Sequence, residues 1–200
     1  KPRIFDNPLQ APVRKLACGS NHCLILSAYR CFAYGSNEFG QLGIDTQSAH
    51  EDRLREVLLP DCNKGIQDIA AGSNHSAIVS AHYGYVYTFG NGSYFKLGHG
   101  RDTHCLAPTR VVELEDVGEF RMDGSTAGVA FVACGAWHTV VVTKGTNDVY
   151  GWGWNNFGNI GRNPLQRSAA LGEGYGTVCA LSCGSRHTAL RTMDGRVIVM

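Results

Sequence analysis

A short motif built around glycine and histidine recurs four times in this chain, and this recurrence constrains the fold more than any other feature. The glycines are Gly19, Gly72, Gly135 and Gly184, and the histidines that follow each of them by three positions are His22, His75, His138 and His187. Successive glycines lie 53, 63 and 49 residues apart. Periods of this length are typical of propellers and solenoids, in which each repeat is one supersecondary unit that packs on its neighbours.

The content of each repeat favours antiparallel strands. A short run rich in β-forming residues follows each histidine, then a turn, then a second such run, and the fourth copy carries the hairpin signal Asp194-Gly195 between its runs. Three copies continue into a motif that begins with an aromatic residue and glycine and ends with leucine or isoleucine and glycine. These segments are Tyr34–Gly43, Phe89–Gly98 and Trp152–Gly161.

The aromatic positions of this second motif are predicted to lie in the core of a blade or between blades. The first aromatic position is held by Tyr34, Phe89 and Trp152, and the second by Phe39, Tyr94 and Phe157. The second copy departs from the pattern, because Phe95 stands where the other copies have glycine. The geometry of that turn is therefore left open.

Taken together, the two motifs resemble the repeat of the regulator of chromosome condensation family, and the resemblance covers nearly the whole chain. That family forms seven-bladed β-propellers with four-stranded antiparallel blades, so the resemblance implies an all-β fold. With a mean period of 55 residues, 200 residues hold about half of the expected ring. We expect one partial propeller domain over residues 1–200, with repeats near 17–70, 70–132 and 132–182 and an incomplete one at 182–200. Further blades or a partner are expected to cover its open side.

Composition excludes several classes of function. The net charge is only +1, which argues against strong electrostatic binding to nucleic acid or to a membrane surface. No apolar run approaches the ~18 residues of a transmembrane helix. The chain shows no signal peptide, and it lacks an initiator methionine, so we expect it to begin inside a longer product or after processing.

The eight cysteines are predicted to be reduced. Cys18, Cys134 and Cys183 occupy one repeat position, where the remaining copy has Ala71, as expected for a small buried apolar side chain. The other five show no paired framework. This usage favours an intracellular location, in the cytoplasm, the nucleus or an organelle.

The recurring glycines and histidines are interpreted as structural rather than catalytic or metal-binding. Histidines that repeat with the period of the fold would lie one per blade, too far apart to share a metal ion, and each is expected to bond the backbone of its own blade. The sequence contains no nucleophile elbow and no phosphate-binding loop. We therefore predict no enzymatic activity, no cofactor and no metal site.

Two segments depart from the repeat and are candidates for function, because repeat proteins place their binding residues in such departures. Residues 44–59 carry mixed charge and are expected to form a surface loop or a short helix. Residues 113–128 form an acidic insertion, predicted to be either a long loop or a protruding hairpin that touches a basic partner. The candidate partner-binding residues in this insertion are Glu115, Asp116, Glu119 and Asp123.

The tryptophans supply the other candidates. Trp152 is predicted to be core, whereas Trp137 and Trp154 are predicted to be partly exposed anchors for a partner. A light-sensing branch of the family uses tryptophans and arginines clustered at a dimer interface. Here all three tryptophans come from one repeat, so we expect no tryptophan cluster that spans several blades.

The sequence thus predicts a non-catalytic protein-interaction propeller that acts as a scaffold or as a subunit of a larger assembly. The alternative is a guanine-nucleotide exchange factor for a Ran-like or other small GTPase, since the family's founding member uses a protruding wedge on Ran. Exchange works by binding the nucleotide-free GTPase preferentially, so it needs no catalytic triad. A chromatin or membrane-regulatory propeller is a third reading, although the arginines of the insertions are scattered.

Overall fold

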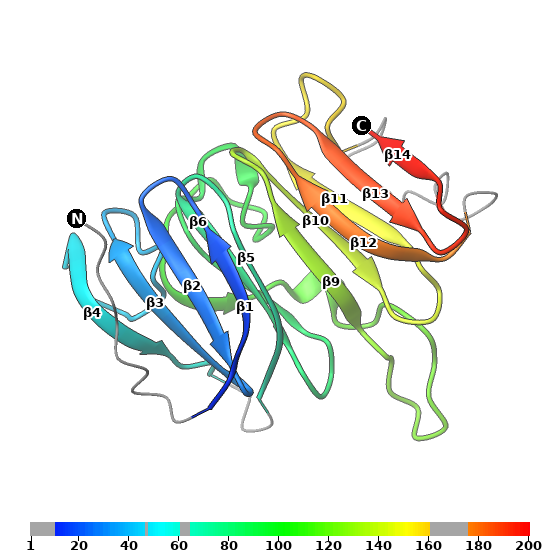
Figure 1. Cartoon of the computed structure of the whole chain (residues 1–200), viewed down its shortest axis with the longest axis horizontal. Coiled ribbons are helices and arrows are strands. Elements are labelled where there is room, and N and C mark those ends of the chain that lie inside the picture. The colour runs from blue at the N-terminus through cyan, green and yellow to red at the C-terminus, as the bar shows by residue number, and fades with distance from the viewer. Residues whose placement is uncertain (1–10, 47, 61–64, 161–175) are drawn as a thin grey trace.

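The strands form four antiparallel sheets that follow one another along the chain (Figure 1). The computed structural model describes residues 11–46, 48–60, 65–160 and 176–200. The first sheet contains β1 (Val13–Cys18), β2 (His22–Ser27), β3 (Arg30–Ser36) and β4 (His50–Val57). The second contains β5 (Ile66–Ala71), β6 (His75–Ser80), β7 (Val86–Gly90) and β8 (Cys105–Arg110).

The third and fourth sheets have three described strands each. The third contains β9 (Val129–Cys134), β10 (His138–Thr143) and β11 (Val149–Gly153). The fourth contains β12 (Val178–Cys183), β13 (Thr188–Thr192) and β14 (Val197–Val199). Two short 3₁₀ helices, η1 (Ser93–Phe95) and η2 (Val112–Leu114), lie in the connections. The prediction of a partial all-β propeller with antiparallel blades is confirmed.

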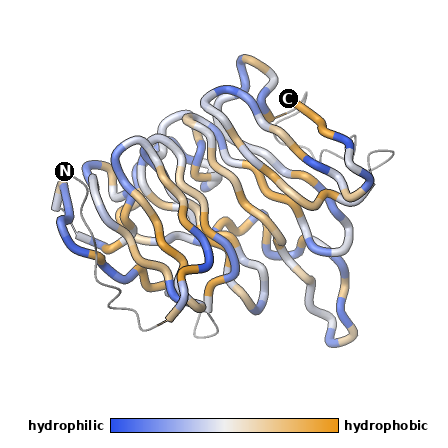
Figure 2. The backbone as a smooth tube through the Cα atoms, in the orientation of Figure 1, coloured by the Kyte–Doolittle hydropathy of each residue, from blue (hydrophilic) through white to orange (hydrophobic). Residues whose placement is uncertain are grey.

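Half of residues 44–59 form a strand rather than a loop or a helix, so the prediction was wrong for these residues. They contain β4, the outermost strand of the first blade, which pairs with β3 in the register Cys31↔Val57 and Phe32↔Glu56. An outermost strand has solvent along its open edge and can carry many charges, which hid its strand character in the sequence. Figure 2 shows the resulting hydrophilic stretch along β4.

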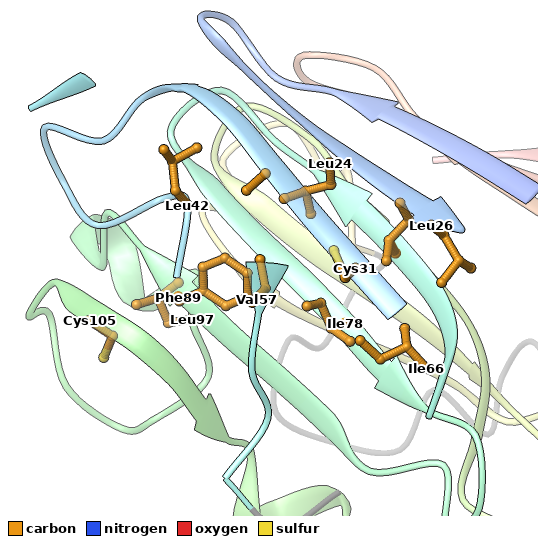
Figure 3. Packing of buried hydrophobic residues seen from close by; sticks show 12 residues of the cluster. Leu24, Leu26, Cys31, Leu42, Val57, Ile66, Ile78, Phe89, Leu97 and Cys105 are labelled. Carbon is orange, nitrogen blue, oxygen red and sulfur yellow. The ribbon is translucent and has the colours of Figure 1, made fainter. Parts of the chain in front are cut away.

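The hydrophobic core lies between successive sheets. One cluster joins the first two blades and includes Leu24, Leu26, Ile78 and Phe89, which point toward one another from facing sheets (Figure 3). Equivalent clusters join the second blade to the third and the third to the fourth. Each blade is therefore stabilised mainly by its neighbours, as expected for a repeat architecture.

Buried histidines join each blade to the next one. Ring Nε2 atoms lie 3.0 Å from hydroxyl oxygens in three pairs, which are His22 with Ser76, His75 with Thr139 and His138 with Thr188. The ring partner is thus a side chain of the following blade, and the predicted bond to the histidine's own blade is wrong for the ring. The sequence could not show this, because Ser76, Thr139 and Thr188 each directly follow a different repeat's histidine.

The bonds of the hydroxyls fix the tautomer of these histidines. Ser76 Oγ donates to the carbonyl of Gln41 at 2.7 Å, and Thr139 Oγ1 donates to that of Lys96 at 2.8 Å. Since a hydroxyl has only one proton to give, it must accept from the histidine, so Nε2 carries the hydrogen. The Nδ1 atoms of His22, His75 and His138 are buried without a hydrogen-bond partner in the part of the chain that the structure describes.

The repeat glycines are required because neighbouring blades approach each other at these positions. A Cβ on Gly72 would lie 2.4 Å from the carbonyl oxygen of Gly135, and one on Gly135 would lie 2.7 Å from that of Gly184. The same Cβ atoms would also overlap the imidazole ring of the histidine three residues later. Missing space, rather than an unusual φ angle, therefore selects glycine here.

Replacing Thr139 by valine should destabilise the chain by about 2 kcal/mol, because the buried Nε2–H of His75 would lose its acceptor. The shape of the side chain is kept, so packing contributes little. Thr109→Val on β8, which is only partly buried, is the matched control and should change stability by less than about 0.5 kcal/mol. Urea denaturation measures both, and equal midpoints for the two variants would contradict the inter-blade role of His75.

Candidate functional site

Four aromatic side chains gather at the end of the sheets where the histidine-bearing turns lie. The Tyr94 and Trp137 ring centroids are 5.4 Å apart, those of Tyr94 and Trp154 are 5.9 Å apart, and those of Trp154 and Phe157 are 5.3 Å apart. We call these four residues, together with Lys96 and Arg186, the aromatic face. The face draws on the second, third and fourth blades.

The loops that follow the repeat motifs place these rings. Trp137 lies in the turn between β9 and β10, and Trp154 follows β11 directly. The backbone N–H of Trp154 donates to the carbonyl of Trp137 at 2.9 Å. The side chain of Asn159 then donates to the carbonyl of Trp154 at 2.8 Å. These bonds fix the two tryptophans relative to the sheet, so the face is preorganised.

Two cations lie against the rings. The ammonium of Lys96 is 4.8 Å from the Trp137 ring centroid and donates to Asn91 Oδ1 at 2.7 Å. Burial lowers the pKa of Lys96 to about 8. The guanidinium of Arg186 is exposed and lies over two rings, 5.8 Å from the Trp154 centroid and 5.0 Å from that of Phe157. Such cation–π contacts hold the cations and the rings together.

Half of the aromatic face is exposed, which corrects one prediction. Tyr94 is 51% exposed and Phe157 is 57% exposed, although the sequence predicted both to be core. The backbone of Tyr94 and Phe95 shows how the second copy forms its turn without the glycine of the other copies. Both residues adopt positive φ, 63° and 59°. Phe95 therefore takes up the left-handed conformation that glycine supplies in the other copies, and this directs both side chains outward.

The three tryptophans have the burial that the sequence predicted. Trp152 is buried, and its Nε1–H donates to the carbonyl of Lys96 at 2.9 Å, as a core tryptophan with a satisfied donor should. Trp137 and Trp154 are half-buried, as predicted, and lie in one cluster, while their role as anchors for a partner stays a prediction. The sequence missed the residues that complete the cluster, Tyr94 and Arg186, because only the packing of adjacent blades brings them to the tryptophans.

The acidic insertion forms a hairpin at the opposite end of the sheets (Figure 1). Phe120 and Thr126 pair in an antiparallel bridge, and Arg121 and Ser125 close the tip through a backbone hydrogen bond of 2.8 Å. Asp123 Oδ1 accepts hydrogen bonds from the backbone and the hydroxyl of Ser125. The protruding hairpin that the sequence offered as one reading is thus present.

The acidic side chains of the insertion do not gather into one patch. Glu115 pairs with Arg110 at 2.8 Å, and Asp123 serves the turn. Beside the exposed Glu119 and Asp123, the hairpin also offers apolar side chains to solvent, since Phe120 is 80% exposed and Met122 is fully exposed. The hairpin that carries Glu119 and Asp123 lies at the opposite end of the sheets from the turns that carry Trp137 and Trp154. Asp116, in contrast, lines a cavity together with Phe95 and Gly153, so the candidates do not form one surface.

The described residues also bear on three other features, which are a metal site, disulfides and a membrane-spanning helix. Within the described ranges, no three His, Cys, Asp or Glu side chains gather in an arrangement that could hold a metal ion. The seven cysteines in those ranges are free thiols. None of the helices in the described part of the chain has the length and apolar character needed to cross a membrane.

Comparison with known proteins agrees with this architecture. The chain is 31% identical over 195 residues to the ultraviolet-B receptor UVR8 of Arabidopsis thaliana, covering 92% of this chain and 40% of UVR8. It is 35% identical over 164 residues to the X-linked retinitis pigmentosa GTPase regulator homolog of Caenorhabditis elegans, covering 80% of this chain and 10% of that protein. The chain therefore spans less than half the length of these relatives.

Among solved structures, Prp20p of Saccharomyces cerevisiae superposes with a TM-score of 0.69 at 26% identity, covering 89% of this chain and 43% of Prp20p. A sequence model of the regulator of chromosome condensation (RCC1) repeat matches residues 30–79 and 83–142, and a second model of the same repeat matches residues 129–159. With more than half of its residues matched and its blades arranged as in Prp20p, the chain belongs to the RCC1 repeat family.

Proposed function

We propose that this chain is a protein-interaction propeller without bond-making chemistry of its own, which acts as a scaffold or as a subunit of a larger assembly. The observation that carries the proposal is the aromatic face. Tryptophan, tyrosine and arginine are the residues that dominate binding energy at protein interfaces. Here they are gathered on loops that a rigid stack of sheets holds in place.

The face also has the physical character of an interface. The Trp154 ring already packs against Tyr94, Phe157 and Arg186, so less side-chain entropy remains to be lost on binding. The backbone strain at Tyr94 and Phe95 keeps apolar side chains in solvent, where they contribute nothing to folding. The free thiols fit the reducing compartments of a cell, where we place the protein.

Affinity purification from cells tests the proposal. Full-length protein should retain specific protein partners, and Trp154→Ala should reduce their recovery at least tenfold, because it removes the ring that contacts Tyr94, Phe157 and Arg186. Tyr29→Ala is the matched control, since Tyr29 is a comparably exposed aromatic residue outside the face. Equal recovery of partners with both variants would show that the aromatic face does not bind them.

Guanine-nucleotide exchange on a small GTPase is a second candidate function, and a different observation favours it. The hairpin of residues 115–128 protrudes from the body and exposes Phe120 and Met122 at its tip, the kind of element that could wedge into a partner. One solved structure similar to this chain is that of Prp20p, whose binding to Gsp1p and histones has been described. Another relative is described as a homolog of a GTPase regulator.

Release of a fluorescent nucleotide from a panel of small GTPases tests this second function. If the hairpin drives exchange, full-length protein accelerates release from one member, and Phe120→Asp lowers the rate at least tenfold without changing the melting temperature. Reversing the charge of Glu119 is the matched variant, and it tests whether the acidic side chains of the same hairpin contact a basic partner. No acceleration across the panel would eliminate exchange and leave the scaffold proposal standing.

A further inference from the structure

We infer that the aromatic face binds a peptide segment of a partner protein in which an apolar anchor residue is followed or preceded by acidic residues. The inference rests on the proposed function and names the chemistry of the partner. Three features of the face carry it: an exposed aromatic surface, an arginine without an ionic partner, and ring faces that are already occupied by cations.

The apolar anchor follows from the rings. Tyr94 and Trp154 are tilted by 38° to each other at 5.9 Å, and Phe157 meets Trp154 edge-on at 5.3 Å. The exposed parts of Tyr94 and Phe157 flank the half-buried Trp154. An aliphatic or aromatic side chain that settles on this surface removes apolar area from water, which favours binding.

The acidic neighbour follows from Arg186. Its guanidinium carbon lies 5.8 Å from the Trp154 centroid and 5.0 Å from the Phe157 centroid, and in the described ranges it has neither an ion pair nor a hydrogen bond. Because this guanidinium is exposed and its N–H donors have no acceptor among the described residues, it can bind a carboxylate with two parallel hydrogen bonds. Lys96 adds a second positive charge beneath Trp137.

The position of the charges also predicts the orientation of the segment. Asp102 lies on the Lys96 side of the face, where its carboxylate accepts a hydrogen bond from the backbone of Phe95. The positive charge of Lys96 is thus partly balanced, whereas that of Arg186 is not balanced by any described residue. The acidic residues of the segment should therefore lie on the side of the fourth blade, with the apolar anchor toward Tyr94.

A cationic ligand is disfavoured by the same geometry. Aromatic cages bind methylated ammonium groups by surrounding them with ring faces. Here Lys96 already lies over Trp137, and Arg186 lies over Trp154 and Phe157. A further cation would meet like charge on three of the four rings.

Selection from a random peptide display library on the immobilised chain tests the inference directly. We expect enrichment of sequences that combine glutamate or aspartate with a nearby large apolar residue. Selected peptides should bind Arg186→Glu at least tenfold more weakly, in titrations followed by tryptophan emission, and increasing salt should weaken them further. Arg191→Glu is the matched control at a second exposed arginine of the same blade and should bind as the wild type does.

Other outcomes would overturn the inference. Enrichment of basic or uncharged peptides would do so, and so would acidic peptides that bind Arg186→Glu unchanged or no enrichment at all. Dimers in light scattering that Arg186→Glu dissolves would assign the face to a second copy of the chain. If partners are recovered from cells through Trp154 while the selected peptides are not acidic, the proposed function survives and only the partner chemistry is wrong.

Discussion

The substitution Gly135→Val is expected to lower the free energy of unfolding by about 2–4 kcal/mol, and it should prevent folding altogether if the chain is only marginally stable. A Cβ at this position would lie 2.1 Å from Cε1 of His138 and 2.7 Å from the carbonyl oxygen of Gly184. To remove these overlaps, the imidazole of His138 would have to move or the third and fourth blades would have to separate. Either movement disrupts the bond between His138 and Thr188.

A second glycine provides the control. Gly124, at the tip of the hairpin, has a φ of +81°, but a Cβ there would meet nothing within 4 Å. Asparagine tolerates positive φ, so Gly124→Asn should cost less than about 1 kcal/mol. Thermal unfolding of the two variants separates crowding between blades from ordinary backbone preference, and similar melting temperatures would refute the crowding account.

Acid should destabilise the chain as the pH falls from 6.5 to 4, by on the order of 3 kcal/mol for each of His22 and His138. Burial lowers the pKa of His22 to about 4 and that of His138 to about 4, and burial lowers the pKa of His75 as well. Protonation would add a donor at Nδ1, which is buried and has no acceptor in the described ranges.

The sign of this dependence follows from linkage. Between pH 6.5 and pH 4 the unfolded chain binds protons at these histidines and the folded chain does not, so folding loses stability as the pH falls. The contribution is complete above about pH 6.5. Urea midpoints measured at half-unit intervals check it, and His138→Asn, whose amide can donate but does not titrate, should flatten the slope. A midpoint that stays constant from pH 7 to pH 5 would contradict the lowered pKa values of these histidines.

The sequence predicted the architecture well because the repeat itself is a physical signal. Gly72 and His75 recur in register with their counterparts since every blade must meet its neighbour in the same way. What the repeat could not show is which residue of the next blade each histidine contacts. The motif of glycine and histidine lies within one blade, whereas the contact of the histidine depends on how two blades pack together.

The candidate site was only half predictable for the same reason. Trp137 and Trp154 stood out by residue type, but Tyr94 was assigned to the core because its repeat position is aromatic in three copies. Its exposure depends on the left-handed backbone that it shares with Phe95. The charged strand β4 was missed because its pattern fits an outer strand as well as a solvated helix. Arg186 became relevant only when the fourth blade placed it over Trp154.

Site-specific photo-crosslinking in cells tests the central claim most directly. A photo-reactive phenylalanine analogue would replace Phe157 on the aromatic face or Phe120 at the hairpin tip, two exposed positions at opposite ends of the full-length protein. The account predicts a crosslinked protein partner from position 157, lost when Arg186→Glu is added to the same chain. Crosslinks that form only from position 120, or from position 157 regardless of Arg186, would contradict it.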